Sequence, residues 1–328
     1  MSADNKNLDG WKNEKDSRGG FFPGANHPDG IGLATAMKLL QGKNIDYAVV
    51  AGRNDLSKEA SGVLKKADLG DRVFFEQFDV TAENATARLL EIIESGFIAE
   101  ETINNLKTVF VTTGASSHSA KNKSEGENDG LENYERVLET NFAVIKNIIF
   151  PLFEHLVENN ISGTTVANAG SFSSEAGKIG LDGNAYATSK EAQSTALKFL
   201  QNCTTEKNLK RAAAGEEELI MGVLDFIYWY IDTRMTCGNS DVNQPLDLET
   251  AAEMTAEKIG KAMNKVESGK SVDRKHYIPN FLCLKKRVLI GIMRLLEKIT
   301  GGRKSVRKEL VKTFQKNIAA NKTKKIDE

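Results

Sequence analysis

The sequence predicts an α/β protein with a doubly wound parallel sheet, followed by a C-terminal amphipathic helical extension. Short apolar segments typical of buried strands alternate with longer segments that have helical periodicity. This alternation implies a parallel sheet with helices on both faces. Ligands in such sheets bind beyond the carboxyl ends of the strands. Polar or glycine-containing residues follow several of the predicted strands, so a site is expected at that edge.

Each predicted element follows from its local pattern. The first strand, 19–22, is short and holds two glycines, which weaken strand character. Further apolar strands are expected at 45–51, 73–78, 108–112, 164–169 and 220–227. Helices are expected at 31–40, 57–66, 82–95, 133–158 and 185–201. The polar segment 116–130 is expected to be a loop at the mouth of the site.

The composition is that of a globular protein and argues against several classes. Of the 328 residues, 40% are hydrophobic and 27% are charged, and the net charge of −1 argues against nucleic-acid binding. Three scattered cysteines form no C-x-x-C pattern, which favours a reducing compartment. The four histidines lack metal-ligand spacing, so no metal is expected. Without a long apolar run or signal-like N-terminus, we expect a cytoplasmic protein.

Tyr186 and Lys190 are the most informative pair in the chain. They lie four residues apart in a predicted helix and therefore share one face. A free tyrosine has a pKa near ~10, and a nearby ammonium lowers it. Such a pair can protonate a carbonyl oxygen or deprotonate an alcohol.

The order and spacing of four residues resemble the short-chain dehydrogenase/reductase family. These residues are Asn141, Ser173, Tyr186 and Lys190, with Ser173 thirteen positions before Tyr186. The resemblance runs from about residue 20 to residue 277 and includes a glycine-rich turn, Asp79-Val80 and Ile231-Asp232-Thr233-Arg234-Met235. It implies a Rossmann-like fold and a nicotinamide-dependent oxidoreductase.

The glycine-rich turn is the expected pyrophosphate site. Glycines there allow a tight turn, and the following helix offers amide donors and a favourable dipole. The residues matched to the cofactor are Gly24, Asn26, Gly30 and Ile31. The turn departs from the family pattern because Pro23 replaces a threonine and two extra residues precede Gly30. Enoyl reductases of the same superfamily have a similarly long turn.

The end of the second strand favours NADP(H), with NAD less expected. An acidic residue there would bind the ribose 2′-hydroxyl of NAD, but the sequence has Arg53, which can pair with a 2′-phosphate. Alternatively, Arg53 is a solvated loop cation. By resemblance, Asp79 and Val80 contact the adenine, and Thr113 and Thr233 line the cofactor.

Other positions depart from the family pattern. The fourth strand ends in Thr112-Thr113-Gly114-Ala115 instead of N-N-A-G, and Tyr228-Trp229 replaces a P-G pair. The two aromatics can stack on the cofactor, face an apolar substrate or belong to the core. An open cleft lined by Tyr186, Ser173 and these aromatics is expected of an active enzyme.

The resemblance implies a role for each member of the tetrad. Tyr186 acts as general acid or base, and Lys190 lowers its pKa and binds the nicotinamide ribose. Ser173 binds the substrate oxygen, although alignment on S-S-x-A-G selects Ser174 instead. Asn141 holds a water that links Lys190 to solvent.

The C-terminal segment is basic and amphipathic. Residues 279–318 are expected to form a helical extension, and residues 319–328 to be a disordered tail. This part is similar to hydroxysteroid dehydrogenase-like reductases, which use such a segment at a membrane surface or a dimer interface. A membrane surface, the domain itself and a partner subunit remain alternatives for it. Residues 1–17 form a polar N-terminal segment, and 18–278 form the main domain.

Together these observations predict an NADP-dependent oxidoreductase that interconverts a carbonyl and a secondary alcohol, on a hydrophobic, steroid- or lipid-like substrate. The alternative is a non-catalytic binding or scaffold protein with a degenerate cofactor site. The family's oligomers imply a homodimer or homotetramer, and contact of the C-terminal helix with an internal membrane surface is one of its three alternatives.

Overall fold

The protein is represented by a computed structural model, which describes residues 7–14, 16–25, 27–54, 57–99, 103–115, 131–171, 173–174, 185–228, 231 and 246–278. The chain divides into two compact units, Met1–Ile278 and Pro279–Glu328. All described residues belong to the first unit. The expected C-terminal extension and tail lie outside them, as does the expected loop 116–130.

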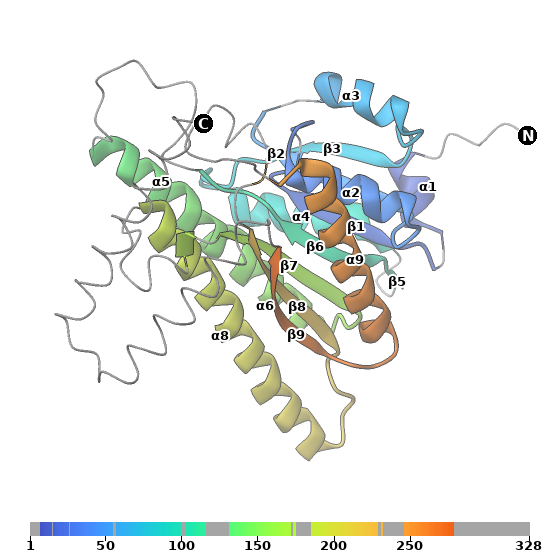
Figure 1. The fold of residues 1–328 in the computed structure, drawn as a ribbon. Coiled ribbons are helices and arrows are strands. Elements are labelled where there is room, and N and C mark those ends of the chain that lie inside the picture. The colour runs from blue at the N-terminus through green and yellow to red at the C-terminus, as the bar shows by residue number, and fades with distance from the viewer. Residues whose placement is uncertain are drawn as a thin grey trace, which may run out of the picture. The chain divides into compact units, whose positions relative to one another are not determined.

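A seven-stranded sheet forms the centre of the first unit (Figure 1). Its order is β3-β2-β1-β6-β7-β8-β9, and every neighbouring pair is parallel. The strands are β1 (Gly19–Pro23), β2 (Tyr47–Gly52), β3 (Val73–Gln77), β6 (Leu106–Val111), β7 (Thr164–Ser171), β8 (Met221–Tyr228) and β9 (Val272–Ile278). A separate antiparallel pair joins β4 (Ile98–Ala99) to β5 (Ile103–Asn104). The doubly wound parallel sheet predicted from the sequence is therefore confirmed.

Helices cover both faces of this sheet. Their bounds are α1 (Leu8–Lys12), α2 (Ile31–Gln41), α3 (Ser57–Lys66), α4 (Ala85–Phe97), α5 (Leu131–Val144), the π-helix η1 (Ile145–Ile149), α6 (Phe150–Glu158), α8 (Ala185–Ala214) and α9 (Leu248–Glu267). One core cluster joins α2, α3 and α9 to the sheet, and a second joins α4, η1, α6 and α8 to the opposite face. The side chains of β1 alternate between the two clusters, with Phe22 in the first and Phe21 in the second.

Strand β1 is intact despite its two glycines. It lies inside the sheet, hydrogen-bonded to β2 and β6, and all five of its residues are buried. A Cβ at Gly19 would lie 2.6 Å from ring atoms of Phe97 and Tyr47, so these aromatic rings occupy the space that a side chain would need. Close packing therefore requires a glycine at position 19, and the strand is not weakened by it.

The chain reverses its winding direction between β1 and β6, which creates the topological switch point of the sheet. The main-chain N–H of Thr112 donates to the Pro23 carbonyl at 3.0 Å. Gly24 has a φ of +84°, and a Cβ there would lie 2.4 Å from the backbone nitrogen of Thr113. A glycine is thus required where the two strand ends meet, at the place where such sheets bind ligands.

Several elements differ from the sequence-based bounds for identifiable reasons. Helix α8 continues to Ala214 because residues 202–214 are rich in strong helix formers, although they lack an apolar face. The expected helix 133–158 is divided by η1. Helix α9 and strand β9 were not predicted. Helix α9 begins at an Asp247 cap, whose side chain accepts from the N–H of Thr250.

Candidate active site

Tyr186 and Lys190 lie in the first two turns of α8, close to the carboxyl end of β7. The Lys190 Nζ atom is 5.9 Å from the centroid of the Tyr186 ring. Tyr186 is half-buried, whereas Lys190 is only 4% exposed. The predicted helical pair therefore exists, with the ammonium on the inner side and the phenol ring toward the surface.

Lys190 is held by two acceptors. Its Nζ atom donates to the main-chain carbonyl of Ala169 and to the Oε1 atom of Gln193, each at 3.0 Å. Burial lowers the pKa of Lys190 to about 8, although the negative charge of Asp225 on β8 partly opposes that shift. A lysine with this pKa exchanges its proton near neutral pH, which suits acid–base chemistry.

Asn141 connects α5 to the end of β6. Its Oδ1 atom accepts from the main-chain N–H of Ala115 at 2.7 Å, and its Nδ2 atom donates to the carbonyl of the same residue at 3.0 Å. The Nδ2 atom also donates to Ser189 Oγ at 2.8 Å. Asn141 is fully buried. It therefore fixes the end of β6 against α8, beside Lys190.

The serines after β7 fold back on the end of that strand. The fully buried Ser174 donates its hydroxyl to the Ser171 carbonyl at 2.6 Å. Ser173 is half-buried, and its main-chain N–H donates to Ser171 Oγ at 3.2 Å. The hydroxyl of Ser174 is thus already engaged in the fold, whereas Ser173 and Ser171 are better exposed.

The turn between β1 and α2 leaves the start of the helix open. Gly30 occupies the N-cap of α2, and no side chain among the described residues caps it. Its N–H donates to the His27 carbonyl at 3.0 Å. A Cβ at Gly32 would lie 2.5 Å from Ala25 Cβ, so the helix packs directly on the turn. Uncapped amides at such a helix start attract phosphate groups.

Two residues that follow β6 lie at the same edge of the sheet. The buried Thr113 Oγ1 atom has no hydrogen-bond partner among the described residues. A Cβ at Gly114 would lie 3.2 Å from both Asn141 Oδ1 and Lys190 Nζ, so the backbone runs close to the tetrad. An orphaned buried hydroxyl, a crowded glycine turn and an uncapped helix together fit a dinucleotide at this edge.

Arg53 and Asp79 stand at the ends of β2 and β3. Arg53 is exposed, and its positive charge acts on Asp79. Burial opposes ionisation of Asp79, but hydrogen bonds from Thr81 and the Arg53 charge outweigh it and hold the Asp79 pKa below its usual value. Val80 is buried, and its carbonyl accepts from Asn147 in η1 at 2.8 Å. These groups lie where the adenosine end of a dinucleotide is expected.

Tyr228 belongs to the core and does not line an open cleft. It is 6% exposed, stacks on Phe226 and shares a 2.7 Å hydrogen bond with Thr255 of α9. Burial raises the pKa of Tyr228 well above its usual value. The sequence left three alternatives for Tyr228, namely stacking on the cofactor, facing a substrate or packing in the core. The structure shows that it packs in the core. Trp229, Asn26 and Thr233 lie outside the described residues.

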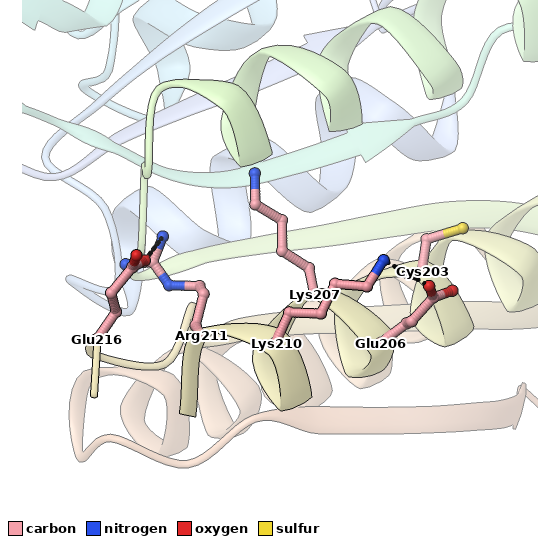
Figure 2. Close-up of a pocket in the computed structure, with 6 residues that line it drawn as sticks. All are labelled: Cys203, Glu206, Lys207, Lys210, Arg211 and Glu216. Carbon is pink, nitrogen blue, oxygen red and sulfur yellow. Dashed lines mark ion pairs between the residues drawn. The ribbon is translucent and has the colours of Figure 1, made fainter. Parts of the chain in front are cut away.

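A hollow of about 400 Å³ lies at the other end of α8 (Figure 2). It is lined by Cys203, Glu206, Lys207, Lys210, Arg211 and Glu216. Glu206 lies roughly 24 Å along the helix from Lys190, at 1.5 Å per residue. The two lysines that line the hollow already have partners. Lys207 donates to the Val157 carbonyl, and Lys210 pairs with Glu206 at 2.8 Å. This hollow is separate from the tetrad.

The comparisons with known proteins agree with this geometry. Residues 26–213, more than half of the chain, match the family model described as short chain dehydrogenase. The chain belongs to the short-chain dehydrogenase/reductase family, whose members are oxidoreductases that use a nicotinamide cofactor. No curated protein sequence matches the chain.

Solved structures support the same fold. Serine dehydrogenase from Escherichia coli is 18% identical, with a TM-score of 0.51 over 79% of this chain and 96% of that one. A short chain dehydrogenase from Burkholderia cenocepacia in complex with NADP is 15% identical, with a TM-score of 0.53 over 86% and 96%. The 3-oxoacyl-[acyl-carrier protein] reductase from Brucella melitensis in complex with NAD is 16% identical, with a TM-score of 0.54 over 80% and 96%.

Two residues at the site were missed by sequence reasoning. Gln193, three positions after Lys190, faces the same side of α8, a spacing that could have identified it. Ser171 is the last residue of β7, and the strand end is where catalytic side chains are expected in such sheets. Within the described part of the chain, no helix is long and apolar enough to cross a membrane, and no group of His, Cys, Asp or Glu is arranged for a metal ion.

Proposed function

We propose that this protein is an NADP(H)-dependent oxidoreductase that interconverts a carbonyl and a secondary alcohol. The observation that carries the proposal is the buried Lys190 ammonium beside the Tyr186 ring, at the sheet edge where Gly24 meets Thr113. A bound nicotinamide supplies or accepts the hydride. The chain's own residues orient the substrate and move the proton.

In this proposal the phenol oxygen of Tyr186 gives its proton to the substrate oxygen during reduction and takes it back during oxidation. The positive charge of Lys190 favours the phenolate form of Tyr186. Lys190 then returns a proton to the Tyr186 oxygen. The half-buried Ser173 donates a hydrogen bond to the substrate oxygen, with Ser171 next to it at the strand end. Asn141 keeps α5 and the end of β6 in position beside Lys190.

The preference for NADP(H) rests on Arg53. This exposed cation directly follows β2, and no acidic residue stands at 51–54 to bind an unphosphorylated ribose. Removing it in Arg53→Ala is expected to weaken NADPH binding about tenfold to a hundredfold, the value of a charge-assisted hydrogen bond. NADH binding should change little. Calorimetric titration of the purified protein with both nucleotides measures the two affinities.

Lys58 provides a matched control for Arg53. It is an exposed cation at the start of α3, five residues away in sequence. Lys58→Ala should leave the ratio of NADPH to NADH affinity unchanged. An equal loss of NADPH affinity in both variants would mean that general positive charge, and not pairing with a 2′-phosphate, attracts the nucleotide.

The hydrophobic, steroid- or lipid-like substrate is proposed from the C-terminal segment, 279–318, which resembles hydroxysteroid dehydrogenase-like reductases.

The second candidate function is a non-catalytic binding protein that retains the fold. It is favoured by Tyr228, which points into the core at a position where the family turns its chain over the nicotinamide. Failure of both nucleotides to bind at millimolar concentration would select this second candidate.

We also propose that the protein forms a homodimer or homotetramer through α5, α6 and α8. Phe150 and Phe199 form an exposed edge-to-face pair, with ring centroids 6.2 Å apart and exposed fractions of 39% and 57%. An exposed aromatic pair is typical of a contact surface, and a second copy of the chain is the occupant implied by the family.

An Asp at position 199 should disrupt this contact. Phe199→Asp is expected to convert the oligomer to a monomer, because an unpaired charge would be buried between two copies. Light scattering after size-exclusion chromatography measures the mass. Leu209→Asp is the control, since Leu209 is 68% exposed on the same helix and is not part of the aromatic pair. A wild-type monomer at all concentrations would contradict the proposal.

A further inference from the structure

Gln193 lies between two groups of the tetrad. Its Oε1 atom accepts from Lys190 Nζ at 3.0 Å, and its Nε2 atom donates to the main-chain carbonyl of Asn141 at 3.1 Å. Gln193 is fully buried, and both partners are nearly so. The side-chain amide thus connects the Lys190 ammonium to the main chain of Asn141, the residue to which the family resemblance assigns a bound water.

The orientation of this amide is determined by its partners. The Asn141 carbonyl can only accept, so the NH₂ group of Gln193 must face it. The amide oxygen must then face Lys190, and it too can only accept. Reversing the amide would place two acceptors together at one end and two donors together at the other, inside the core.

Two hydrogen-bond acceptors determine which side of the Lys190 amine is free to exchange a proton. A neutral amine has two N–H groups and one lone pair, and an ammonium has three N–H groups. The Ala169 carbonyl and Gln193 Oε1 each take one N–H. Lys190 makes no other hydrogen bond with the described residues, and Gly114 and the Tyr186 ring lie beside it. The lone pair, or the third N–H, therefore points toward the site.

We propose that Gln193 is a positioning residue that directs the exchangeable proton of Lys190 toward the active site by occupying one of its other N–H groups. The proposal rests on the proposed function of the site for its catalytic meaning. Asn141 then serves as the anchor of Gln193, because its carbonyl fixes the amide that holds Lys190.

Among the residues that the structure describes, the charged and titratable neighbours of Lys190 are few, so the effect of Gln193 can be separated from theirs. Asp225 on β8 acts on Lys190 through its negative charge, and Tyr186 lies on the same helix. The group from β7 that contacts Lys190 is the uncharged Ala169 carbonyl, and the uncharged Asn141 of α5 lies near Lys190, beside Gly114. Burial of Lys190 makes its ammonium depend strongly on each acceptor.

The test measures the Lys190 pKa in the protein without nucleotide. Lysine labelled with ¹³C is incorporated, the Lys190 signal is assigned by its loss in Lys190→Met, and its Cε shift is followed with pH. Gln193→Leu removes the acceptor, so the pKa should fall by about one unit or more. Gln193→Glu places a carboxylate there, so the pKa should rise by a similar amount. These opposite shifts would not arise from a role in packing alone.

Asn105→Leu is the control, because Asn105 is a buried amide that donates to the Lys12 carbonyl at the opposite end of β6. It should leave the Lys190 pKa unchanged. An unchanged Lys190 pKa in Gln193→Glu would overturn the proposal even if Gln193→Leu fails to fold. Because no nucleotide is present, opposite shifts support the positioning role even where NADPH and NADH both fail to bind, which would reject the oxidoreductase separately.

Discussion

Tyr186→Phe is expected to abolish carbonyl reduction while leaving NADPH binding intact. The substitution removes the phenol oxygen, which is the proposed proton donor, and keeps the ring that lies 5.9 Å from Lys190 Nζ. Proton transfer by a positioned side chain contributes about 10²- to 10⁴-fold to a rate, and the loss should fall in that range. The measurement is NADPH consumption with a panel of apolar ketones and aldehydes, alongside a calorimetric titration with NADPH.

The serines provide an internal comparison in the same assay. Ser173→Ala should lower turnover less than Tyr186→Phe, because a hydrogen bond to the substrate oxygen is lost but the proton donor remains. Ser174→Ala should act mainly on stability, since its buried hydroxyl donates to the Ser171 carbonyl. A Tyr186→Phe variant with wild-type turnover and unchanged NADPH affinity would exclude Tyr186 as the proton donor.

The sheet could be predicted from the sequence because its strands are short, apolar and separated by amphipathic helices. Residues 164–169 and 220–227, for example, correspond closely to β7 and β8. In contrast, β9 holds Asp273, Arg274 and Lys275 and has no apolar run that would reveal a strand. It is positioned by pairing with β8, which is a tertiary effect that local periodicity does not contain.

The glycines of β1 illustrate the same limit. Local propensity predicts a weak strand at Gly19 and Gly20, but the first glycine leaves room for Phe97 of α4 and Tyr47 of β2. These partners are 78 and 28 residues away from Gly19 in the sequence. Only the folded arrangement reveals that a larger side chain would not fit.

At the site, the helical spacing of Tyr186 and Lys190 was sufficient to predict that they would meet. The spacing did not reveal how deeply Lys190 is buried, because burial depends on α5 and β7 packing around it. Nor did it identify Gln193, whose role depends on the carbonyl of Asn141, 52 residues earlier. The position of Tyr228 could not be predicted either. Its hydroxyl is held in the core by a hydrogen bond with Thr255, which lies on α9, a helix that the sequence did not predict.

The burial of Lys190 also predicts a pH-dependent stability difference between the wild type and Lys190→Met. Burial lowers the folded-state pKa of Lys190 to about 8, from 10.5 in an exposed chain. Between these values the unfolded chain holds a proton that the folded protein has lost, so wild-type stability rises with pH across this window. Below pH 8 both states are protonated, and the cost of the buried charge is fully present.

This cost is about 3 kcal/mol, because each pKa unit corresponds to about 1.4 kcal/mol. Methionine has an unbranched, flexible side chain that can follow the lysine stem. It leaves the Ala169 carbonyl and Gln193 Oε1 without their donor, and that loss does not depend on pH. The stability of Lys190→Met relative to the wild type should therefore fall by about 3 kcal/mol as the pH rises from about 8 to 10.5.

Urea unfolding of both proteins at several pH values across this window measures the difference. Lys58→Met is the control, because Lys58 is an exposed surface lysine, and the stability of this variant relative to the wild type should not change with pH. If Lys190→Met differed from the wild type by a constant amount at every pH, Lys190 would have an ordinary pKa in the folded protein. The lowered pKa that suits Lys190 to proton exchange near neutral pH would then be rejected.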